Sequence, residues 1–380
     1  MGHLVGPVLF VAWVAACSNA DPAPAQSGGA AGAGSGSAGS SGASLGGAGG
    51  SVAGSGGTPG SSGAGASGSS TGGVSQGGAG GASSGSAGAA GSGGGGSGGE
   101  PPATGMCPTT LPALAAEGDN GFYAERQGIP HGEVKEVQYE GGGNKTMHVY
   151  TPPGYASDTA VSYPVLYINH GGGENDTHWG CTSGYNCGYA GRILDNLLAD
   201  GKAVPMIIAM PDTGDCANFD PPEPPDYEDP CTTQYVDDII PYIEQTYRVK
   251  KDRHSRAIAG LSMGGLVVLN TGFAHLELFS HVFVYSSGYT AEQRPEWEQN
   301  LSGVLGDPQT TNQLLNAPVY LAAGATDIAL PNSQAVRDIF EEHQIKVLWQ
   351  DSSLGHEWGN WRRYLAQTLP LMFKNTSGCN

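Results

Sequence analysis

Positively charged residues are absent from the first 103 positions of this 380-residue chain, and all 16 Lys and Arg residues lie beyond them. From residue 22 onward the same stretch is almost wholly Gly, Ser and Ala, with almost no large apolar side chain. Such a composition cannot bury enough surface to offset the entropy of ordering the chain. We therefore predict a disordered Gly/Ser/Ala-rich tether over residues 18–103 and one folded domain over residues 104–380.

A long apolar run is also missing, because the run at residues 4–14 is too short to cross a bilayer. It ends in small residues before a cysteine, Val14-Ala15-Ala16-Cys17, which resembles the lipobox of bacterial lipoproteins. This resemblance implies a signal segment over residues 1–17 and attachment to a membrane through lipid on Cys17. The lack of Lys and Arg near the start is atypical, and a cleaved secretory signal with an incidental cysteine is the alternative. Both interpretations predict export to the bacterial cell envelope or beyond it.

Acidic residues exceed basic ones, 35 against 16, and give a formal net charge of −19. A surface of this sign repels nucleic acid and anionic lipid, so we expect no nucleic-acid partner. We expect a monomer.

Six of the seven cysteines lie in the predicted domain, which is an even number in an exported chain and predicts up to three disulfides. The absence of a C-x-x-C pair argues against a metal site or a redox pair, and we expect no metal and no cofactor. Six cysteines allow fifteen pairings. Nearness in sequence favours Cys216–Cys231 and Cys181–Cys187, which leaves Cys107 to join the two ends of the domain through Cys379.

Short apolar runs alternate with segments of helical period throughout the predicted domain. The runs lie at 134–139, 147–150, 165–168, 206–210, 257–259, 282–285, 319–322 and 347–349. Apolar residues at helical spacing predict helices at 235–247, 193–198, 264–274, 334–342 and 361–373. Strands that alternate with helices predict a mostly parallel eight-stranded sheet with helices on both faces. Residues 141–144 separate the first two runs closely and predict a hairpin.

The pentapeptide Gly260-Leu261-Ser262-Met263-Gly264 is a G-x-S-x-G motif between an apolar run and an apolar helical segment. A strand, a tight turn and a helix are the context that exposes a serine hydroxyl as a nucleophile. Together with the eight strands and the hairpin, this motif predicts the α/β-hydrolase fold.

A serine hydroxyl needs a histidine to accept its proton and a carboxylate to orient that histidine. Asp327 and His356 follow Ser262 in the expected chain order, each on a loop directly after an apolar run. Asp307 and Asp351 compete for the role of the acid, but Asp307 lies in a polar loop with no strand before it. We predict Ser262, Asp327 and His356 as the catalytic residues.

The oxyanion of such a reaction needs backbone donors, for which the sequence offers two. One is the N–H of Met263, the residue after the nucleophile, and the other is Gly172 in the glycine-rich loop at 170–173. An ordinary tight turn is the alternative interpretation of this loop. We expect His170 to brace the loop by hydrogen bonding and not to titrate in the reaction.

Several segments carry a family resemblance that covers nearly all of residues 133–374. They are residues 150–155, 163–167, 170–176, 240–244, 247–249, 256–265 and 355–361. The set resembles the esterase D-like α/β-hydrolases, and within them it is most similar to the feruloyl esterase modules of xylan-degrading systems. The resemblance implies hydrolysis of feruloyl or acetyl esters on plant xylan through an acyl-enzyme, with the residue roles predicted above. The chain departs from the family pattern at 174–179 and 212–231, which we expect near the mouth of the site.

Some alternatives stay open at this point. Trp179 and Trp358, with Tyr185 and Trp361, could stack on a substrate or pack in the core. The acidic stretch at 220–229 could bind calcium, although its prolines favour a solvated rim closed by a disulfide. An acyltransferase with a non-water acceptor and an inactive polysaccharide-binding module are the alternative functions.

Overall fold

The computed structural model describes residues 107–140, 144–221, 229–374 and 378–379. The predicted signal segment 1–17, the lipid attachment site Cys17 and the predicted tether at 18–103 lie outside the described residues. Within the described part of the chain, no helix has the length and apolar character needed to cross a membrane.

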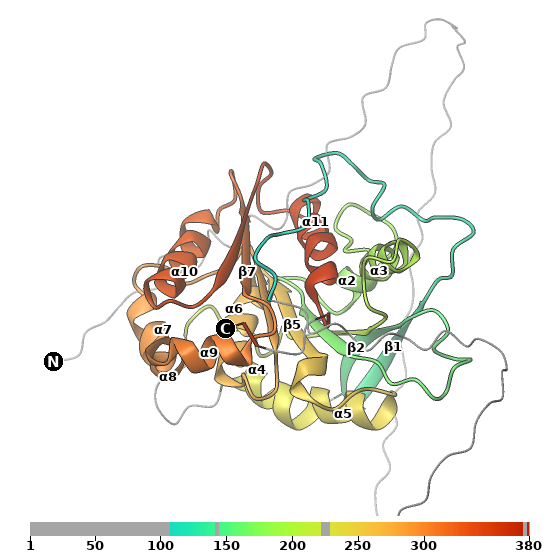
Figure 1. The fold of residues 1–380 in the computed structure, drawn as a ribbon, viewed down its shortest axis with the longest axis horizontal. Coiled ribbons are helices and arrows are strands. Elements are labelled where there is room, and N and C mark those ends of the chain that lie inside the picture. Colours follow the sequence, from blue (N-terminus) through green and yellow to red (C-terminus); the bar gives the residue numbers. More distant parts are fainter. Residues whose placement is uncertain (1–106, 141–143, 222–228, 375–377, 380) are drawn as a thin grey trace, which may run out of the picture. The chain divides into compact units, whose positions relative to one another are not determined.

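Eight strands of the described residues form one sheet, shown in Figure 1, in the order β1-β2-β4-β3-β5-β6-β7-β8. Only the β1/β2 and β2/β4 pairs are antiparallel, and all other neighbours are parallel. The prediction of a mostly parallel eight-stranded sheet that starts with an antiparallel pair is confirmed, while the turn at 141–143 is not described. The strands are β1 (Glu133–Glu140), β2 (Asn144–Thr151), β3 (Val165–Asn169), β4 (Ile207–Pro211), β5 (Arg256–Leu261), β6 (His281–Tyr285), β7 (Val319–Gly324) and β8 (Val347–Ser352).

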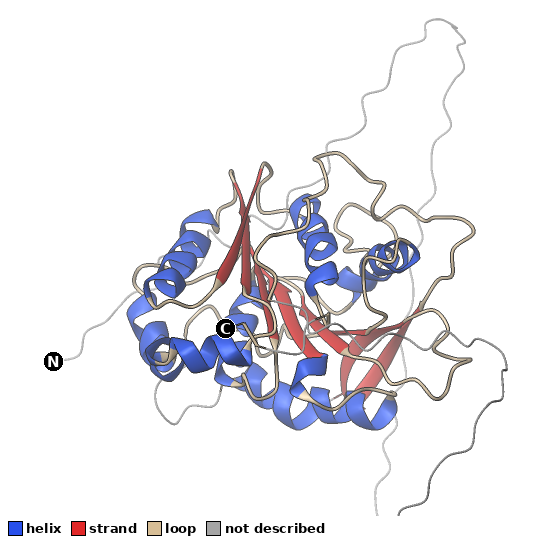
Figure 2. Ribbon diagram, in the orientation of Figure 1, coloured by secondary structure: helices blue, strands red, loops and turns tan. Residues whose placement is uncertain are grey.

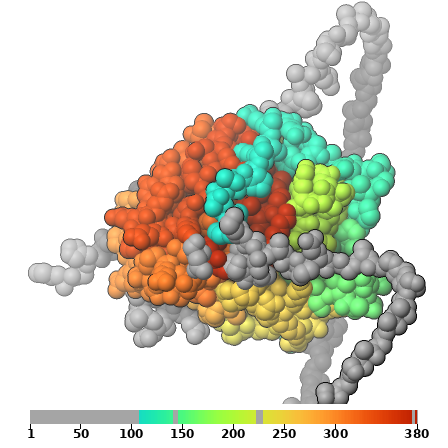
Figure 3. Space-filling model, in the orientation of Figure 1, coloured from blue at the N-terminus to red at the C-terminus, as the bar shows by residue number. Residues whose placement is uncertain are grey.

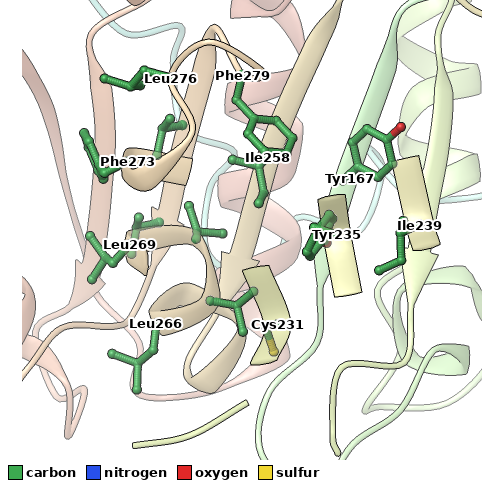
Figure 4. Packing of buried hydrophobic residues seen from close by; sticks show 14 of the residues in the cluster. Tyr167, Cys231, Tyr235, Ile239, Ile258, Leu266, Leu269, Phe273, Leu276 and Phe279 are labelled. Atoms are coloured by element: carbon green, nitrogen blue, oxygen red, sulfur yellow. The ribbon is translucent and has the colours of Figure 1, made fainter. Parts of the chain in front are cut away.

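Helices cover both faces of the sheet, as Figure 2 shows. Each central strand is a continuous apolar run, because its alternate side chains enter a separate core on either side. In β3, for example, Tyr167 belongs to one core cluster and Leu166 and Ile168 to the other. The Tyr167 cluster, part of which Figure 4 shows, includes residues of η1 (Gln234–Ile239), α5 (Ile240–Thr246), α6 (Met263–Val267), η3 (Val268–Gly272) and α10 (Leu330–Glu342). The opposite cluster includes residues of α2 (Thr177–Gly180), α3 (Ala190–Ala199) and α11 (Trp358–Thr368).

The helix predicted at 235–247 is present but not uniform. The chain winds as α4 (Pro230–Thr233), then as the wider π-helical turn η1, and then as α5. Pro241 lacks an N–H donor, which interrupts the regular hydrogen-bond ladder just where α5 begins.

Short helices between β6 and β7 were not predicted, because they are polar and lack a repeating apolar stripe. They are α7 (Arg294–Asn300), α8 (Ser302–Gly306) and α9 (Pro308–Leu314). There are two further single turns in the described residues. The turn η2 (Arg253–Ser255) directly precedes β5, and η4 (Leu369–Leu371) directly follows α11.

All three predicted disulfides, Cys107–Cys379, Cys181–Cys187 and Cys216–Cys231, are present. The first joins the ends of the described domain, and Figure 3 shows the segment that begins at residue 107 beside the C-terminal residues. Hydrogen bonds fasten this segment to α11, from Arg363 Nε to the carbonyl of Ala115 (2.7 Å) and from Gln367 Nε2 to the carbonyl of Pro112 (2.6 Å). The N-terminal segment of the domain therefore packs against the folded core, with Leu111 and Leu114 partly buried on it.

Candidate active site

Ser262 lies in the sharp turn between β5 and α6, with a φ of 52° and a ψ of −122°. A positive φ is unfavourable for any residue with a side chain, so the surrounding packing holds the turn in place. Glycines allow that packing. A Cβ on Gly264 would lie 2.3 Å from the carbonyl oxygen of His170, and one on Gly260 would lie 2.2 Å from that of Gly264. The turn therefore needs both motif glycines, as the G-x-S-x-G pattern indicates.

The structure brings Ser262, His356 and Asp327 together from three loops at the carboxyl edge of the sheet. His356 Nε2 lies 2.9 Å from Ser262 Oγ, and His356 Nδ1 lies 2.8 Å from Asp327 Oδ1. The side chains of His356 and Asp327 are 5% and 0% exposed, so water does not compete for these contacts. With the proton on Nδ1, the imidazole donates to Asp327 and can accept the hydroxyl proton of Ser262.

The Asp327 carboxylate is held in its ionised form. Burial acts to raise the pKa of Asp327, but hydrogen bonds from His356, Ser286 and the backbone of Ala329 outweigh it and leave the pKa below its ordinary value. The Ala329 N–H donates to Oδ1 over 2.8 Å. An ionised carboxylate at this place accepts the hydrogen bond of His356 Nδ1 and so fixes the orientation of the imidazole.

The competing acids have other partners. Asp307 caps the N-terminus of α9, where its Oδ1 accepts from the N–H of Thr310 over 3.1 Å. Asp351 Oδ1 accepts from Trp349 Nε1 over 2.8 Å. Asp327 is thus the aspartate that contacts His356.

The glycine-rich loop after β3 lies against the nucleophile. A Cβ placed on Gly171 would lie 3.3 Å from Ser262 Cβ, and one on Gly172 would lie 2.4 Å from Met263 Sδ. Met263 is the first residue of α6, where backbone N–H groups have no partner within the helix. The two predicted oxyanion donors, Gly172 and Met263, therefore lie next to each other beside Ser262.

The buried side chain of His170 contacts this loop and is only 3% exposed. Its Nδ1 lies 2.8 Å from the carbonyl of Gly171, and the N–H of Thr213 donates to its Nε2 over 3.1 Å. Asp212 Oδ1 lies 3.2 Å from the same nitrogen and accepts from the N–H of Gly214 over 3.0 Å. The expected bracing role of His170 agrees with these contacts.

The expected insertion at 212–231 begins beside the site. Asp212 and Thr213 contact His170, and the ring of Phe219 lies 3.9 Å from the position of a Cβ on Gly172. The calcium-loop alternative falls largely on residues 222–228, which are outside the described residues. Among the residues that the structure does describe, no three His, Cys, Asp or Glu side chains gather as they would around a metal ion.

The predicted substrate contacts of Trp179 and Trp358 need correction, because both side chains are core residues. Trp179 is 1% exposed and Trp358 is 2% exposed, and their rings meet edge to face at 4.9 Å. Both indole N–H groups donate within the protein, Trp179 to the carbonyl of Asn169 and Trp358 to Glu174. Neither ring has a free face for a ligand, so packing satisfies the aromatic character that suggested binding.

Tyr185 is the exposed aromatic residue of this region, at 55% exposure. It lies in the loop closed by Cys181–Cys187, and its hydroxyl donates to Glu357, the neighbour of His356. Arg362 Nη1 holds the base of the loop by donating to the carbonyls of Tyr185 (3.1 Å) and Cys187 (3.0 Å). A half-exposed aromatic residue therefore lies close to the histidine loop.

Two residues without a predicted role contact this machinery. Ser286 faces Asp327 and accepts from Trp361 Nε1 over 3.0 Å. Glu174 contacts both Gly171 and Trp358. The contacts of Ser286 with Trp361 and of Glu174 with Trp358 could not be found from the sequence, because these partners lie far apart in the chain.

The fold and the site together define an α/β-hydrolase with a serine at its nucleophile elbow. The family model described as "Putative esterase" matches residues 140–372, so the chain belongs to this esterase family. The resemblance seen in the sequence is thereby confirmed.

Known proteins with similar sequences or structures include feruloyl esterases. The chain is 30% identical over 274 residues to an endo-1,4-beta-xylanase/feruloyl esterase of Xylanibacter ruminicola, in an alignment that covers 67% of this chain and 33% of that protein. The chain thus spans about a third of that relative's length. A solved ferulic acid esterase has 25% identity and a TM-score of 0.54, with 63% of this chain and 97% of that chain covered.

A third comparison supports the fold. The feruloyl esterase module from Clostridium thermocellum, in a variant complexed with sinapinate, has a TM-score of 0.58 at 20% identity. The alignment covers 70% of this chain and 96% of that chain.

Proposed function

We propose that this domain is a serine carboxylic-ester hydrolase that acts on carbohydrate-linked esters, namely feruloyl or acetyl groups of plant xylan. The observation that carries the proposal is the imidazole of His356, which contacts Ser262 Oγ at 2.9 Å and Asp327 Oδ1 at 2.8 Å. A buried carboxylate, an imidazole and a strained serine in this order form the arrangement that activates a hydroxyl nucleophile.

In the proposed reaction Ser262 Oγ attacks the ester carbonyl carbon while its proton passes to His356 Nε2. The N–H groups of Met263 and Gly172 donate to the oxyanion that forms. Collapse of this intermediate breaks the bond to the alcohol oxygen, which takes the proton from His356 and leaves. Water then attacks the acyl-enzyme, with His356 again accepting a proton, and the acid and free Ser262 are released.

The substrate part of the proposal has two supports. The sequence relative and the solved structures described above are named as feruloyl or ferulic acid esterases. In addition, the exposed ring of Tyr185 next to the histidine loop is a surface on which a sugar or an aromatic acyl group can stack.

We also propose that the protein is exported and lipid-anchored, with Cys17 as the attachment site and residues 18–103 as the tether. Three disulfides support export, because such bonds form in oxidising compartments. Incorporation of labelled palmitate in the native bacterial host tests the anchor. Equal labelling of the wild type and Cys17→Ala would rule out Cys17.

A fluorophosphonate probe tests the nucleophile directly. We expect one covalent adduct on Ser262 of the folded domain and none on Ser262→Ala, which should also lose esterase activity.

Turnover of methyl ferulate, acetylated xylan and p-nitrophenyl acetate then ranks the acyl groups. A sugar acceptor in the same assay separates hydrolysis from acyl transfer, because a transferase forms a new ester in place of free acid. Undiminished turnover by Ser262→Ala would refute the proposal.

A further inference from the structure

Glu174 contacts Gly171, three residues before it, and Trp358, 184 residues after it. Its Oε2 accepts from the N–H of Gly171 over 2.9 Å, and its Oε1 accepts from the indole N–H of Trp358 over 2.8 Å. Gly171 belongs to the loop that offers the oxyanion donor, and Trp358 is two residues beyond His356. One carboxylate therefore connects the oxyanion loop to the histidine loop.

The Trp358 end of this bridge is rigid. Trp358 is buried between Trp179 and Trp361, with ring centroids 4.9 Å and 5.4 Å away. Trp361 in turn packs edge to face on the imidazole of His356 at 5.0 Å. Because Trp358 begins α11 and Trp361 lies one turn later, the position of the indole N–H is fixed relative to His356.

At the Gly171 end of the bridge, His170 Nδ1 lies 2.8 Å from the carbonyl oxygen of Gly171, and the Glu174 carboxylate accepts from the N–H of the same residue. Gly171 and Gly172 have no side-chain packing of their own, and Gly173 adopts a φ of 75°. The hydrogen bond from Gly171 to Glu174 orients the peptide between His170 and Gly171, which directly precedes the peptide that carries the N–H of Gly172. A shift here moves the N–H of Gly172 relative to Ser262.

We propose that Glu174 is a positioning residue that fixes the Gly172 N–H for the oxyanion by anchoring the glycine loop to Trp358. This inference rests on the proposed function. A carboxylate suits the role because both of its partners are N–H donors. Glutamine has the same shape but offers one acceptor and one NH₂ group, so Glu174→Gln sets a donor against a donor at one end of the bridge.

An oxyanion donor acts only when negative charge develops in the transition state, which separates this role from a general contribution to folding. Misplacing the donor should lower kcat and leave KM nearly unchanged. It should also weaken binding of a boronic acid, which forms a tetrahedral adduct with the serine. A purely structural carboxylate would instead lower the melting temperature without this pattern.

The test compares Glu174→Gln with the wild type on p-nitrophenyl acetate. We expect kcat to fall by about 10- to 100-fold, KM to change by less than about twofold, and the Ki of phenylboronic acid to rise in step with the fall in kcat. Glu125→Gln is the matched control, because Glu125 also accepts a hydrogen bond from a residue distant in the chain, from Arg192 Nη2 over 3.0 Å, and Arg192 lies in α3. It should retain wild-type kinetics.

Trp358→Phe removes the donor at the other end and keeps an aromatic ring in the core. We expect a fall in kcat in the same direction, and a double variant that is no worse than Glu174→Gln alone. Independent effects that multiply in the double variant, or wild-type kcat in Glu174→Gln, would overturn the inference.

Backbone hydrogen exchange keeps the test independent of turnover. The amides of Gly171 and Gly172 should exchange faster in Glu174→Gln than in the wild type, while amides of β3 are unchanged. Equal exchange at the two glycines would refute the bridge. A wild-type enzyme with no ester turnover would refute the proposed function instead.

Discussion

The carboxyl edge of the sheet differs from its two faces in backbone strain and in the polarity of its buried side chains. On the faces, apolar side chains fill continuous cores on regular strands. At the edge, Ser262 and Ser286 directly follow the neighbouring strands β5 and β6, and both have a positive φ, 52° and 51°. Strained backbone and buried charge are unfavourable by themselves and persist where surrounding packing holds them. The comparison therefore predicts that edge substitutions change rates and face substitutions change stability.

Asp327→Asn should show the largest effect at the edge. We expect kcat to fall by about 10⁴-fold, because an asparagine favours the wrong tautomer of His356 and cannot stabilise its charged form. The free energy of unfolding near pH 7 should change far less than kcat, since the two side chains have nearly the same shape. Kinetics with p-nitrophenyl acetate and guanidinium unfolding check both expectations.

Asp307→Asn is the matched control for this substitution, because asparagine also caps a helix and Asp307 lies outside the site. It should keep the wild-type rate. Similar losses of kcat in the two variants would contradict the assigned role of Asp327.

Phe279→Ala, in the core on one face of the sheet, should lower stability and leave the rate nearly unchanged. Phe279 is fully buried and packs edge to face on Tyr167 and Tyr235, with both centroids 6.2 Å away (Figure 4). Its removal leaves a cavity that should lower the free energy of unfolding by about 3–5 kcal/mol. The folded fraction should keep kcat within about twofold of the wild type.

Val161→Ala is the control for Phe279→Ala, since Val161 is 38% exposed. Its unfolding free energy should stay within about 0.5 kcal/mol of the wild type. A large loss of kcat in folded Phe279→Ala would show that the face and the edge are coupled.

Local patterns predicted much of this architecture because they depend on neighbours in the sequence. Short β-prone runs rich in apolar residues located all eight strands, and the G-x-S-x-G elbow with its two glycines located Ser262. Chain order together with a position directly after a predicted strand favoured Asp327 and His356. Even the disulfides followed from nearness in sequence and the joining of the domain ends.

Features that depend on distant partners could not be predicted in this way. The aromatic character of Trp358 suggested binding, but its burial depends on Trp179 and its hydrogen bond on Glu174, both far away in the sequence. Long-range contacts, rather than residue type, therefore decide whether such a tryptophan is buried. The helix α9 was missed for a local reason, because its signal is a cap on Asp307 and a proline, without an apolar stripe.

The smallest expected effect concerns the contact between His148, in β2, and Asp176, the residue before α2. His148 Nδ1 lies 3.0 Å from Asp176 Oδ2, and this hydrogen bond raises the pKa of His148 despite partial burial, with Glu136 adding to the effect. A raised folded-state pKa stabilises the fold fully below the unfolded pKa of about 6.5, and the gain is lost as pH rises through the folded pKa. The pair should therefore contribute on the order of 1 kcal/mol at pH 6 that is absent at pH 9.

Urea unfolding of the wild type and His148→Gln between pH 6 and pH 9 measures this contribution. The difference between the two should be largest at pH 6 and shrink as pH rises, and Asp176→Asn should show the same trend. His343→Gln is the control, because this histidine contacts the carbonyl of Leu305 instead of a carboxylate. If the edge and the faces are independent, kcat of His148→Gln at pH 7 stays within about twofold of the wild type. A larger fall would mean that the α2 side of the glycine loop transmits changes in the sheet to the site.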